Sequence, residues 1–349
     1  MKKLIFAALL LSAIGASAQQ DTLKYRINLT DKAVTDYALD RPEEFLSKKA
    51  IERRQKQGLA IDSTDLPVCR KYVDAIRKKG VKIVITGKWD NFVTVSCNDT
   101  TLIDKIAQLP FVRTTEKVWT APDPEQPAMA TKRDSLINTP LWIEEVYGPA
   151  RRQIEISNGN KLHDAGFKGQ GMTIAVIDAG FHNADSIAAM RNIRVLGVKD
   201  FVNPDADIYA ESSHGMSVLS CIGMNQPHVM VGTAPEASFW LVRSEDEYSE
   251  PLVEQDYRYC DLDGKFALMS RQAAKAADKG MVIVCSAGNA GSGSWKKTTP
   301  PGDAENVLTV GAINKQGVLA PFSSIGNTAD GRVKPDVMAV GLGSDVMGT

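Results

Sequence analysis

The distribution of hydrophobic and polar positions divides the chain into two halves with different patterns. Over residues 23–118, short alternating runs and amphipathic stretches take turns, whereas from Leu141 onward the apolar runs are short and almost unbroken. Alternation predicts strands with one buried face, and unbroken apolar runs predict strands buried on both faces of a parallel sheet. The pattern therefore predicts two domains of different architecture.

The first half predicts a small mixed domain. Strands are expected at 23–29, 81–89, 91–98 and 111–118, and helices at 68–79 and 101–109. The order strand, helix, strand, strand, helix, strand is that of a ferredoxin-like α+β fold. An extra basic helix over 42–57 follows the first strand, and we expect its charges to form a solvated face rather than a nucleic-acid patch.

A proline-rich segment separates the two halves. Pro122, Pro124 and Pro127 lie there among small and acidic residues, a composition typical of an exposed linker that proteases cut. Beyond it, strands are expected at 172–177, 238–242 and 281–285, with helices at 217–224 and 264–279. Alternation of strand and helix predicts an α/β domain whose parallel sheet carries helices on both faces.

The first eighteen residues predict export. Lys2 and Lys3 precede an apolar run from Leu4 to Ala16, and small residues continue to Ala18. This order is typical of a secretory signal peptide, and the run is shorter than the about 20 residues that span a bilayer. The later apolar runs are shorter still and broken by charge. We therefore expect a secreted protein, extracellular or periplasmic, with no membrane span.

Charge and cysteine content narrow the function classes. The chain has 41 Lys and Arg against 42 Asp and Glu, a net charge of -1, which argues against a nucleic-acid partner held by bulk charge. Its 5 cysteines lack the C-x-x-C spacing of a zinc or redox centre, and its 4 histidines form no H-E-x-x-H motif. The sequence therefore argues against a metal hydrolase and against a disulfide-dependent fold.

Three polar residues stand where α/β proteins gather their functional groups, at the carboxyl ends of strands. Asp178 closes the run 173–177, His214 opens a predicted helix, and Asn289 comes just after the strand at 281–285. Taken singly, each also fits a turn former or a helix cap. Taken together, Asp, then His, then an amide donor is an order found in serine hydrolases.

With these residues in view, the sequence resembles the subtilisin-like (subtilase, S8) serine peptidases. The matching stretches cover most of residues 150–349 in family order: GMTIAVIDAG (171–180), SHGMSV (213–218), VGTAP (231–235), SAGN (286–289), FSS (322–324) and KPDV (334–337). Between the signal peptide over 1–18 and the linker over 121–140, in which we expect maturation to cut, the resemblance implies a propeptide domain over 19–120. It implies a three-layer, subtilisin-like peptidase domain over 141–349, which we expect to be incomplete at its C-terminal end.

The resemblance also assigns roles and partners. His214 would be the general base, Asp178 would hold the tautomer of its imidazole, and Asn289 would donate its amide to the oxyanion. The implied partners are protein or peptide substrates, and the propeptide as inhibitor, with no cofactor required. Many relatives bind structural calcium, but no ligand set matches residue by residue, so the sequence assigns no metal site.

Two departures from the family pattern bear on activity. The family nucleophile is a serine in a Gly-Thr-Ser stretch, and this sequence ends at Gly348 and Thr349, so we expect the chain as given to cleave peptides inefficiently. Between Val242 and Gly264 the family has a further helix and a strand that forms one wall of the substrate pocket. The acidic stretch found here is too short for both, so we expect a central strand to be missing.

Two other function classes compete with a peptidase. A nucleotide-binding fold is disfavoured because Gly169 and Gly171 precede their strand, whereas a phosphate-binding loop follows one. A degenerate, non-catalytic peptide-binding protein is the stronger alternative. The presence of both Asp178 and His214 argues weakly against it, because peptide binding alone needs neither.

Overall fold

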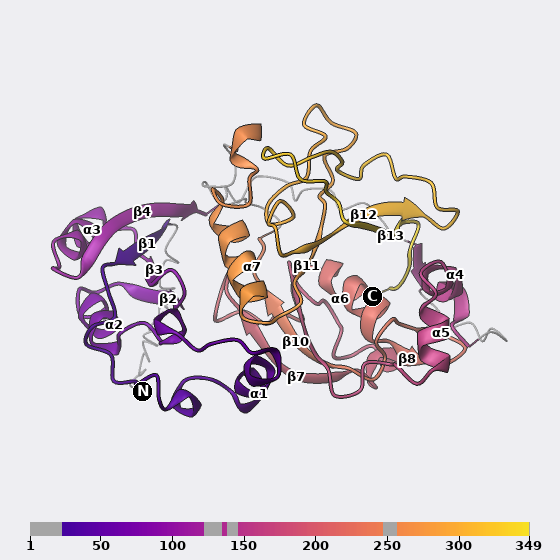
Figure 1. Ribbon diagram of the computed structural model, residues 1–349, viewed down its shortest axis with the longest axis horizontal. Coiled ribbons are helices and arrows are strands. Elements are labelled where there is room, and N and C mark those ends of the chain that lie inside the picture. Colours follow the sequence, from indigo (N-terminus) through magenta and orange to yellow (C-terminus); the bar gives the residue numbers. More distant parts are fainter. Residues whose placement is uncertain (1–22, 122–134, 138–145, 247–256, 349) are drawn as a thin grey trace, which may run out of the picture.

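The computed structural model describes residues 23–121, 135–137, 146–246 and 257–348. The predicted signal peptide and most of the predicted linker lie outside these ranges. The described residues form two lobes, an N-terminal lobe over 23–121 and a larger C-terminal lobe over 146–348 (Figure 1). Within these ranges, none of the helices is both long enough and apolar enough to cross a membrane.

The N-terminal lobe is built on a four-stranded antiparallel sheet in the order β2-β3-β1-β4. Its elements are β1 (Leu23–Leu29), α2 (Arg70–Arg77), β2 (Lys82–Gly87), β3 (Phe92–Ser96), α3 (Thr100–Ala107) and β4 (Val112–Thr120). Ile76 of α2 and Ile106 of α3 are fully buried against Ile27 and Val93 of the sheet. The predicted ferredoxin-like α+β fold is confirmed, because strand order and helix placement both agree with it.

The segment after β1 differs from the prediction of one solvated basic helix over 42–57. A 3-10 turn, η1 (Pro42–Glu44), comes first, and α1 (Lys48–Gln57) begins only after Ser47, whose hydroxyl accepts a hydrogen bond from the amide of Ala50. A serine in this position starts a new helix rather than continuing an old one. Arg54 of α1 is 2% exposed and pairs with Asp65 of η2 (Ser63–Asp65). The charges of this insertion are therefore partly buried.

The C-terminal lobe contains two parallel three-stranded sheets, β7-β10-β6 and β11-β12-β13. Their strands are β6 (Thr173–Asp178), β7 (Arg194–Asp200), β10 (Ser238–Arg243), β11 (Val284–Ser286), β12 (Leu308–Asn314) and β13 (Val337–Leu342). In the described part of the chain no strand lies between β10 and β11, and no strand pairing joins the two sheets. Residues 247–256, where part of the family's extra helix and strand would fall, lie outside the described residues.

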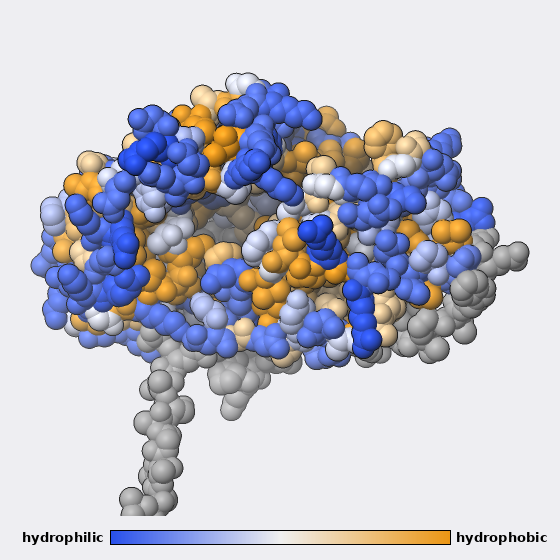
Figure 2. Space-filling model, turned by 90° about the horizontal axis from the view of Figure 1, so that it is seen from below, coloured by the Kyte–Doolittle hydropathy of each residue, from blue (hydrophilic) through white to orange (hydrophobic). Residues whose placement is uncertain are grey.

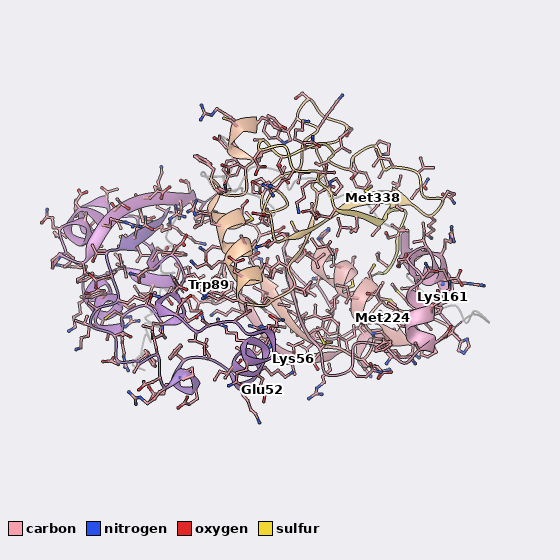
Figure 3. The ribbon with its side chains drawn as sticks, viewed as in Figure 1. Glu52, Lys56, Trp89, Lys161, Met224 and Met338 are labelled. Carbon is pink, nitrogen blue, oxygen red and sulfur yellow. The ribbon has the colours of Figure 1, made fainter. Side chains whose placement is uncertain are left out.

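Helices and short strands surround these sheets. They are η3 (Gly148–Ala150), α4 (Arg151–Glu155), α5 (Gly159–Asp164), η4 (Ala188–Met190), α6 (His214–Gly223), β8 (Asn225–Gln226), β9 (Met230–Val231), η6 (Tyr259–Asp261) and α7 (Leu268–Asp278), with β14 (Asp345–Met347) paired in parallel to β5 (Ser135–Ile137). The main core packs α6 against β6 and β10, and Met224 at the end of α6 is fully buried there (Figure 3).

The expected burial of the parallel strands on both faces is met only in part. Along β10, Phe239 and Leu241 are fully buried, but Trp240 between them is 44% exposed. Ile177 of β6 and Val284 of β11 are likewise exposed. Hydrophobic groups also lie among polar ones on the face of the molecule seen in Figure 2. An apolar run predicts a strand but does not say which elements cover its second face.

Because β10 is buried on one face only, substitutions at two neighbouring positions should lower the free energy of unfolding by different amounts. Phe239→Ala should lower the free energy of unfolding by about 3–5 kcal/mol, because it empties a buried site where the Phe239 ring packs against Gly223. Trp240→Ala should cost clearly less, since that ring is already partly in water. Denaturant unfolding of both variants measures the difference. Equal losses would mean that the face bearing Trp240 is covered.

Candidate active site

The structure brings Asp178 and His214 together. Asp178 is the last residue of β6 and His214 the first of α6, and the His214 Nδ1 lies 2.8 Å from the Asp178 Oδ1. The Asp178 side chain is 8% exposed, whereas the His214 side chain is 53% exposed. An ionised carboxylate only accepts hydrogen bonds, so the proton of a neutral imidazole resides on Nδ1. Nε2 is then the nitrogen able to accept a proton.

Glycines allow this close approach. A Cβ on Gly215 would lie 2.4 Å from the carbonyl oxygen of Gly180 and 2.8 Å from the Cβ of Asp178. A Cβ on Gly180 would lie 2.4 Å from the backbone nitrogen of Ser212. All three distances are far inside van der Waals contact, so only glycine lets the first turn of α6 lie against the end of β6. The His-Gly pair is therefore part of the geometry of the site.

A buried arginine supports the two loops around Asp178. Arg243 ends β10 opposite Asp178 in the strand register, and its Nε donates to the carbonyl of Ala179 at 3.0 Å. Its two Nη atoms lie 3.1 Å from the carboxylates of Asp200 and Glu211. Sequence reasoning missed Arg243, although an arginine directly after the apolar run 238–242 is the signal that could have found it. We regard it as a positioning residue.

Asn289 lies in the turn after β11, in the second sheet, and its side chain is exposed. The turn is fixed by Ser324, whose amide donates to the carbonyl of Gly288 at 2.9 Å and whose hydroxyl accepts from the amide of Ala290 at 3.0 Å. Gly288 has φ of 97°, and a Cβ there would lie 2.6 Å from the Thr299 hydroxyl. The Phe-Ser-Ser motif at 322–324 thus positions Asn289, a role that sequence reasoning did not assign.

Among the described residues, neither a metal-binding cluster of side chains nor a readily formed thiolate lies near this pair. The described residues contain no group of three or more His, Cys, Asp or Glu side chains arranged to hold a metal ion. Cys285 lies on β11, four positions before Asn289, but burial raises the pKa of its thiol to about 11, with the charge of Asp303 adding to the effect. Because the thiolate is the nucleophilic form, Cys285 is a poor nucleophile at neutral pH.

The close approach at Gly215 predicts that adding one methyl group disrupts the pair. Gly215→Ala should push α6 away from β6 and break the bond between His214 and Asp178. The downfield NMR resonance of the His214 Nδ1 proton reports that bond and should be lost. Gly293→Ala is the matched control, because a Cβ at Gly293 meets nothing nearer than 3.4 Å. A resonance that survives in Gly215→Ala would show that the helix tolerates the extra atom.

Comparison with known proteins relates both lobes to characterised families. Residues 24–133 match the family model of the peptidase S8 propeptide domain of Bacteroidota. Residues 169–347, slightly more than half of the chain, match the model of the subtilase family. The predicted resemblance to subtilisin-like peptidases with an N-terminal propeptide domain is confirmed by these two matches.

Individual relatives agree with this assignment. The chain is 29% identical over 224 residues to Subtilisin NAT of Bacillus subtilis subsp. natto, covering 59% of this chain and 53% of the relative. It is 27% identical over 226 residues to Serine protease AprX of Bacillus subtilis (strain 168), covering 54% and 49%. The chain therefore spans about half the length of the curated relatives it matches.

A solved structure supports the same fold. A mutant of the epidermin leader peptide processing serine protease of Staphylococcus aureus superposes with a TM-score of 0.52, at 14% identity, covering 92% of this chain and 76% of that chain. At that identity the likeness concerns the fold alone, and it confirms the expected subtilisin-like α/β architecture. From the extent of the matching family model and the agreement of the relatives, we conclude that this chain belongs to the subtilase family.

Proposed function

We propose that the protein is a serine endopeptidase of the subtilase family, made as a secreted zymogen. The observation that carries this proposal is the 2.8 Å contact between the His214 Nδ1 and the buried carboxylate of Asp178. A half-exposed imidazole, held at one nitrogen by a buried carboxylate, is the arrangement that a general base requires. A non-catalytic peptide-binding protein would have no need of it.

The chemistry that we propose is acyl transfer through a serine hydroxyl. The His214 Nε2 takes the hydroxyl proton as the oxygen attacks the scissile carbonyl, and then gives the proton to the leaving amine. Asp178 stays ionised throughout and stabilises the imidazolium. The family nucleophile directly follows a Gly-Thr pair, which Gly348 and Thr349 supply here. The amide of Met347, just before this pair, donates to the Ser220 hydroxyl of α6 at 3.1 Å, which ties this segment to the helix that His214 begins.

Asn289 is proposed to donate its side-chain amide to the oxyanion of the tetrahedral intermediate. Its exposed position, in a turn held by Ser324, supports this role, because a preorganised donor needs no reorganisation during the reaction. The proposed reaction uses only side chains and needs no cofactor.

The N-terminal lobe is proposed to act as the propeptide, which assists folding and inhibits the enzyme until it is cut off. The family match over 24–133 supports this role. A further support is β5, over 135–137, which lies within the predicted linker and pairs in parallel with β14, next to the Gly-Thr pair. We propose that an extended segment of this kind covers the site before maturation. The substrates would be proteins or peptides outside the cytoplasm, since residues 1–18 have the sequence of a signal peptide.

Fluorophosphonate labelling of the complete gene product tests the proposed function. We expect labelling at a single serine, and a labelling rate at least about 10³-fold lower in His214→Ala. His182→Ala is the control and should label normally, because His182 stands outside the pair. A gene product that binds peptides but takes no label would favour the degenerate binding protein instead.

The role proposed for Asn289 predicts a specific kinetic effect. In subtilisin, a relative of this chain, loss of the corresponding donor lowers kcat about 10²–10³-fold. Asn289→Ala in the complete protein should therefore lower kcat by a similar factor with little change in KM, as expected for a contact made only in the transition state. Asn306→Ala, an exposed asparagine of the same lobe, serves as control. A comparable rise in KM would argue that Asn289 only shapes the turn.

A further inference from the structure

The two lobes meet through polar contacts that differ greatly in burial. At one place Lys82 of β2 pairs with Asp205 at 2.8 Å, but the two side chains are 54% and 77% exposed. At a second place Asp90 lies 3.7 Å from Arg271 of α7, and these side chains are 31% and 43% exposed. Exposed ion pairs contribute little to stability, because water and salt screen them. Neither contact accounts for firm docking.

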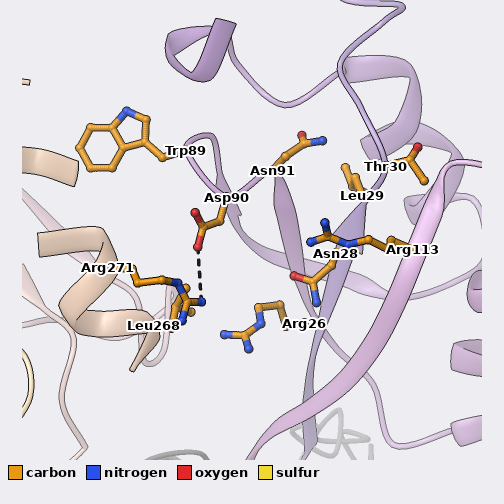
Figure 4. A pocket seen from close by; sticks show the side chains of 10 residues that line it. All are labelled: Arg26, Asn28, Leu29, Thr30, Trp89, Asp90, Asn91, Arg113, Leu268 and Arg271. Atoms are coloured by element: carbon orange, nitrogen blue, oxygen red, sulfur yellow. Dashed lines mark ion pairs between the residues drawn. The ribbon is translucent and has the colours of Figure 1, made fainter. Parts of the chain in front are cut away.

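The second contact also borders an open space. A cavity of about 460 Å³ lies between the sheet of the N-terminal lobe and α7, lined among others by Arg26, Arg113, Leu268 and Arg271 (Figure 4). The side chain of Asp90 reaches across one side of it toward Arg271. The four-stranded sheet and the first half of α7 are therefore not closely packed here.

The third contact lies at the C-terminal end of α7 and is buried from solvent. The Lys279 Nζ lies 2.8 Å from the Asp62 Oδ2 and 3.2 Å from the Asp65 Oδ2. Asp65 also pairs with both Nη atoms of Arg54, one of them at 2.7 Å. The side chains of Lys279 and Asp65 are 7% and 0% exposed, so this cluster is shielded from solvent.

Helix α1 completes the contact through its side chains. The last carbonyl groups of a helix lack partners within the helix, and two carbonyls at the end of α7 find partners on α1. The Arg53 Nε donates to the carbonyl of Lys279 at 3.2 Å, and the Gln57 Nε2 donates to that of Gly280 at 3.4 Å. A Cβ on Gly280 would lie 2.1 Å from the Gln57 Oε1, so glycine permits this approach.

The four-stranded sheet adds one hydrogen bond to the contact, from the Nζ of Lys24 on β1 to the carbonyl of Val202 at 2.8 Å, and Lys24 is only partly buried. We propose that residues 47–66 form an ionic latch with Lys279, and that this buried cluster is the main attachment of the N-terminal lobe to the C-terminal lobe. Its biological meaning, retention of the propeptide before maturation, rests on the proposed function. The latch itself rests only on the contacts described.

Burial explains why this cluster can control docking. Removing one member of a buried ion cluster leaves charge without compensation in a poorly solvated place, which is far more costly than loss of a surface pair. Lys279 is the member contributed by the C-terminal lobe, whereas Arg54 and Asp65 belong to the N-terminal lobe. If Lys279 is removed, the docked cluster holds the two carboxylates of Asp62 and Asp65 against the single charge of Arg54, so docking becomes less favourable. The undocked N-terminal lobe still has its own Arg54–Asp65 ion pair, so the lobe itself stays folded.

The latch should hold in mild acid. Burial by itself would raise the pKa of Asp65, but hydrogen bonds from Arg54, the Asp62 amide and Lys279 hold it far below its usual range. Lys32 and Lys88 also lie within electrostatic reach of this carboxylate. A carboxyl with a lowered pKa stabilises the folded state above the ordinary value of about 4, and that contribution is lost as the pH falls toward the lowered pKa. Mild acidification should therefore leave the latch closed.

Hydrogen exchange of the full chain, followed by mass spectrometry, tests the latch. In Lys279→Met the peptides covering α1 and η2 should exchange at least about tenfold faster than in the wild type, while those of β1 and β3 keep their protection. Asp62→Asn should act in the same direction but less, because that carboxylate is half-exposed. Lys275→Met is the matched control, since among the described residues Lys275 of α7 forms no ion pair.

Two results would overturn the proposal. One is unchanged exchange of α1 and η2 in Lys279→Met. The other is faster exchange of β1 and β3 together with α1, which would mean that the substitution unfolds the lobe rather than undocking it. The readout uses neither catalysis nor labelling, so its failure and failure of the proposed peptidase function can be told apart.

Discussion

The approach of α6 to the end of β6 is the constraint on which the candidate site depends. A parallel strand ends at a sheet edge where its last side chain has no strand neighbour beyond it. The helix that begins with His214 reaches this edge only because Gly180 and Gly215 carry no Cβ. Arg243 then fixes the chain on both sides of the pair, through Ala179 and Glu211. Sterics bring the two groups together, and electrostatics keep them there.

The other half of the proposed site is held by different means. Asn289 follows β11, which forms no described pairing with the sheet that carries Asp178. Its turn is instead held by Ser324 through two hydrogen bonds. The proposed oxyanion donor and the proposed base are thus positioned by separate sheets, and their mutual geometry depends on how those sheets pack. Each of the two unpaired sheets also has an exposed apolar side chain, Ile177 on β6 and Val284 on β11.

The contact between the lobes combines weak and strong elements. Two of its ion pairs, Lys82 with Asp205 and Arg271 with Asp90, are exposed and contribute specificity more than stability, as in other interfaces between domains. The cluster around Lys279 differs because it is buried and because it uses an insertion that the ferredoxin-like order does not require. An interface with one buried attachment can be firm while the chain is intact. When the attachment at Lys279 is lost, the two lobes can separate while each stays folded.

Much of this could be predicted from the sequence, because local patterns carry it. Alternation and strand order predicted the N-terminal lobe, and β1 lies over Leu23–Leu29 as expected. The motifs around Asp178 and His214 predicted both residues of the pair and the family. A polar residue directly after an apolar run, or at the start of a helix, can be recognised from the order of residues alone. The boundaries of the predicted domains and the roles of the three candidate residues stay predictions.

What the sequence could not determine depends on contacts between distant segments. The basic insertion was expected to be solvated, yet Arg54 is buried, because Asp65 and Lys279 approach it only in the folded chain. The apolar runs were expected to be covered on both faces, yet Trp240 and Ile177 are exposed, because covering a face depends on elements elsewhere. Composition and periodicity determined which elements form. Only the tertiary structure decided which charges and which faces are removed from water, because burial is a property of neighbours in space.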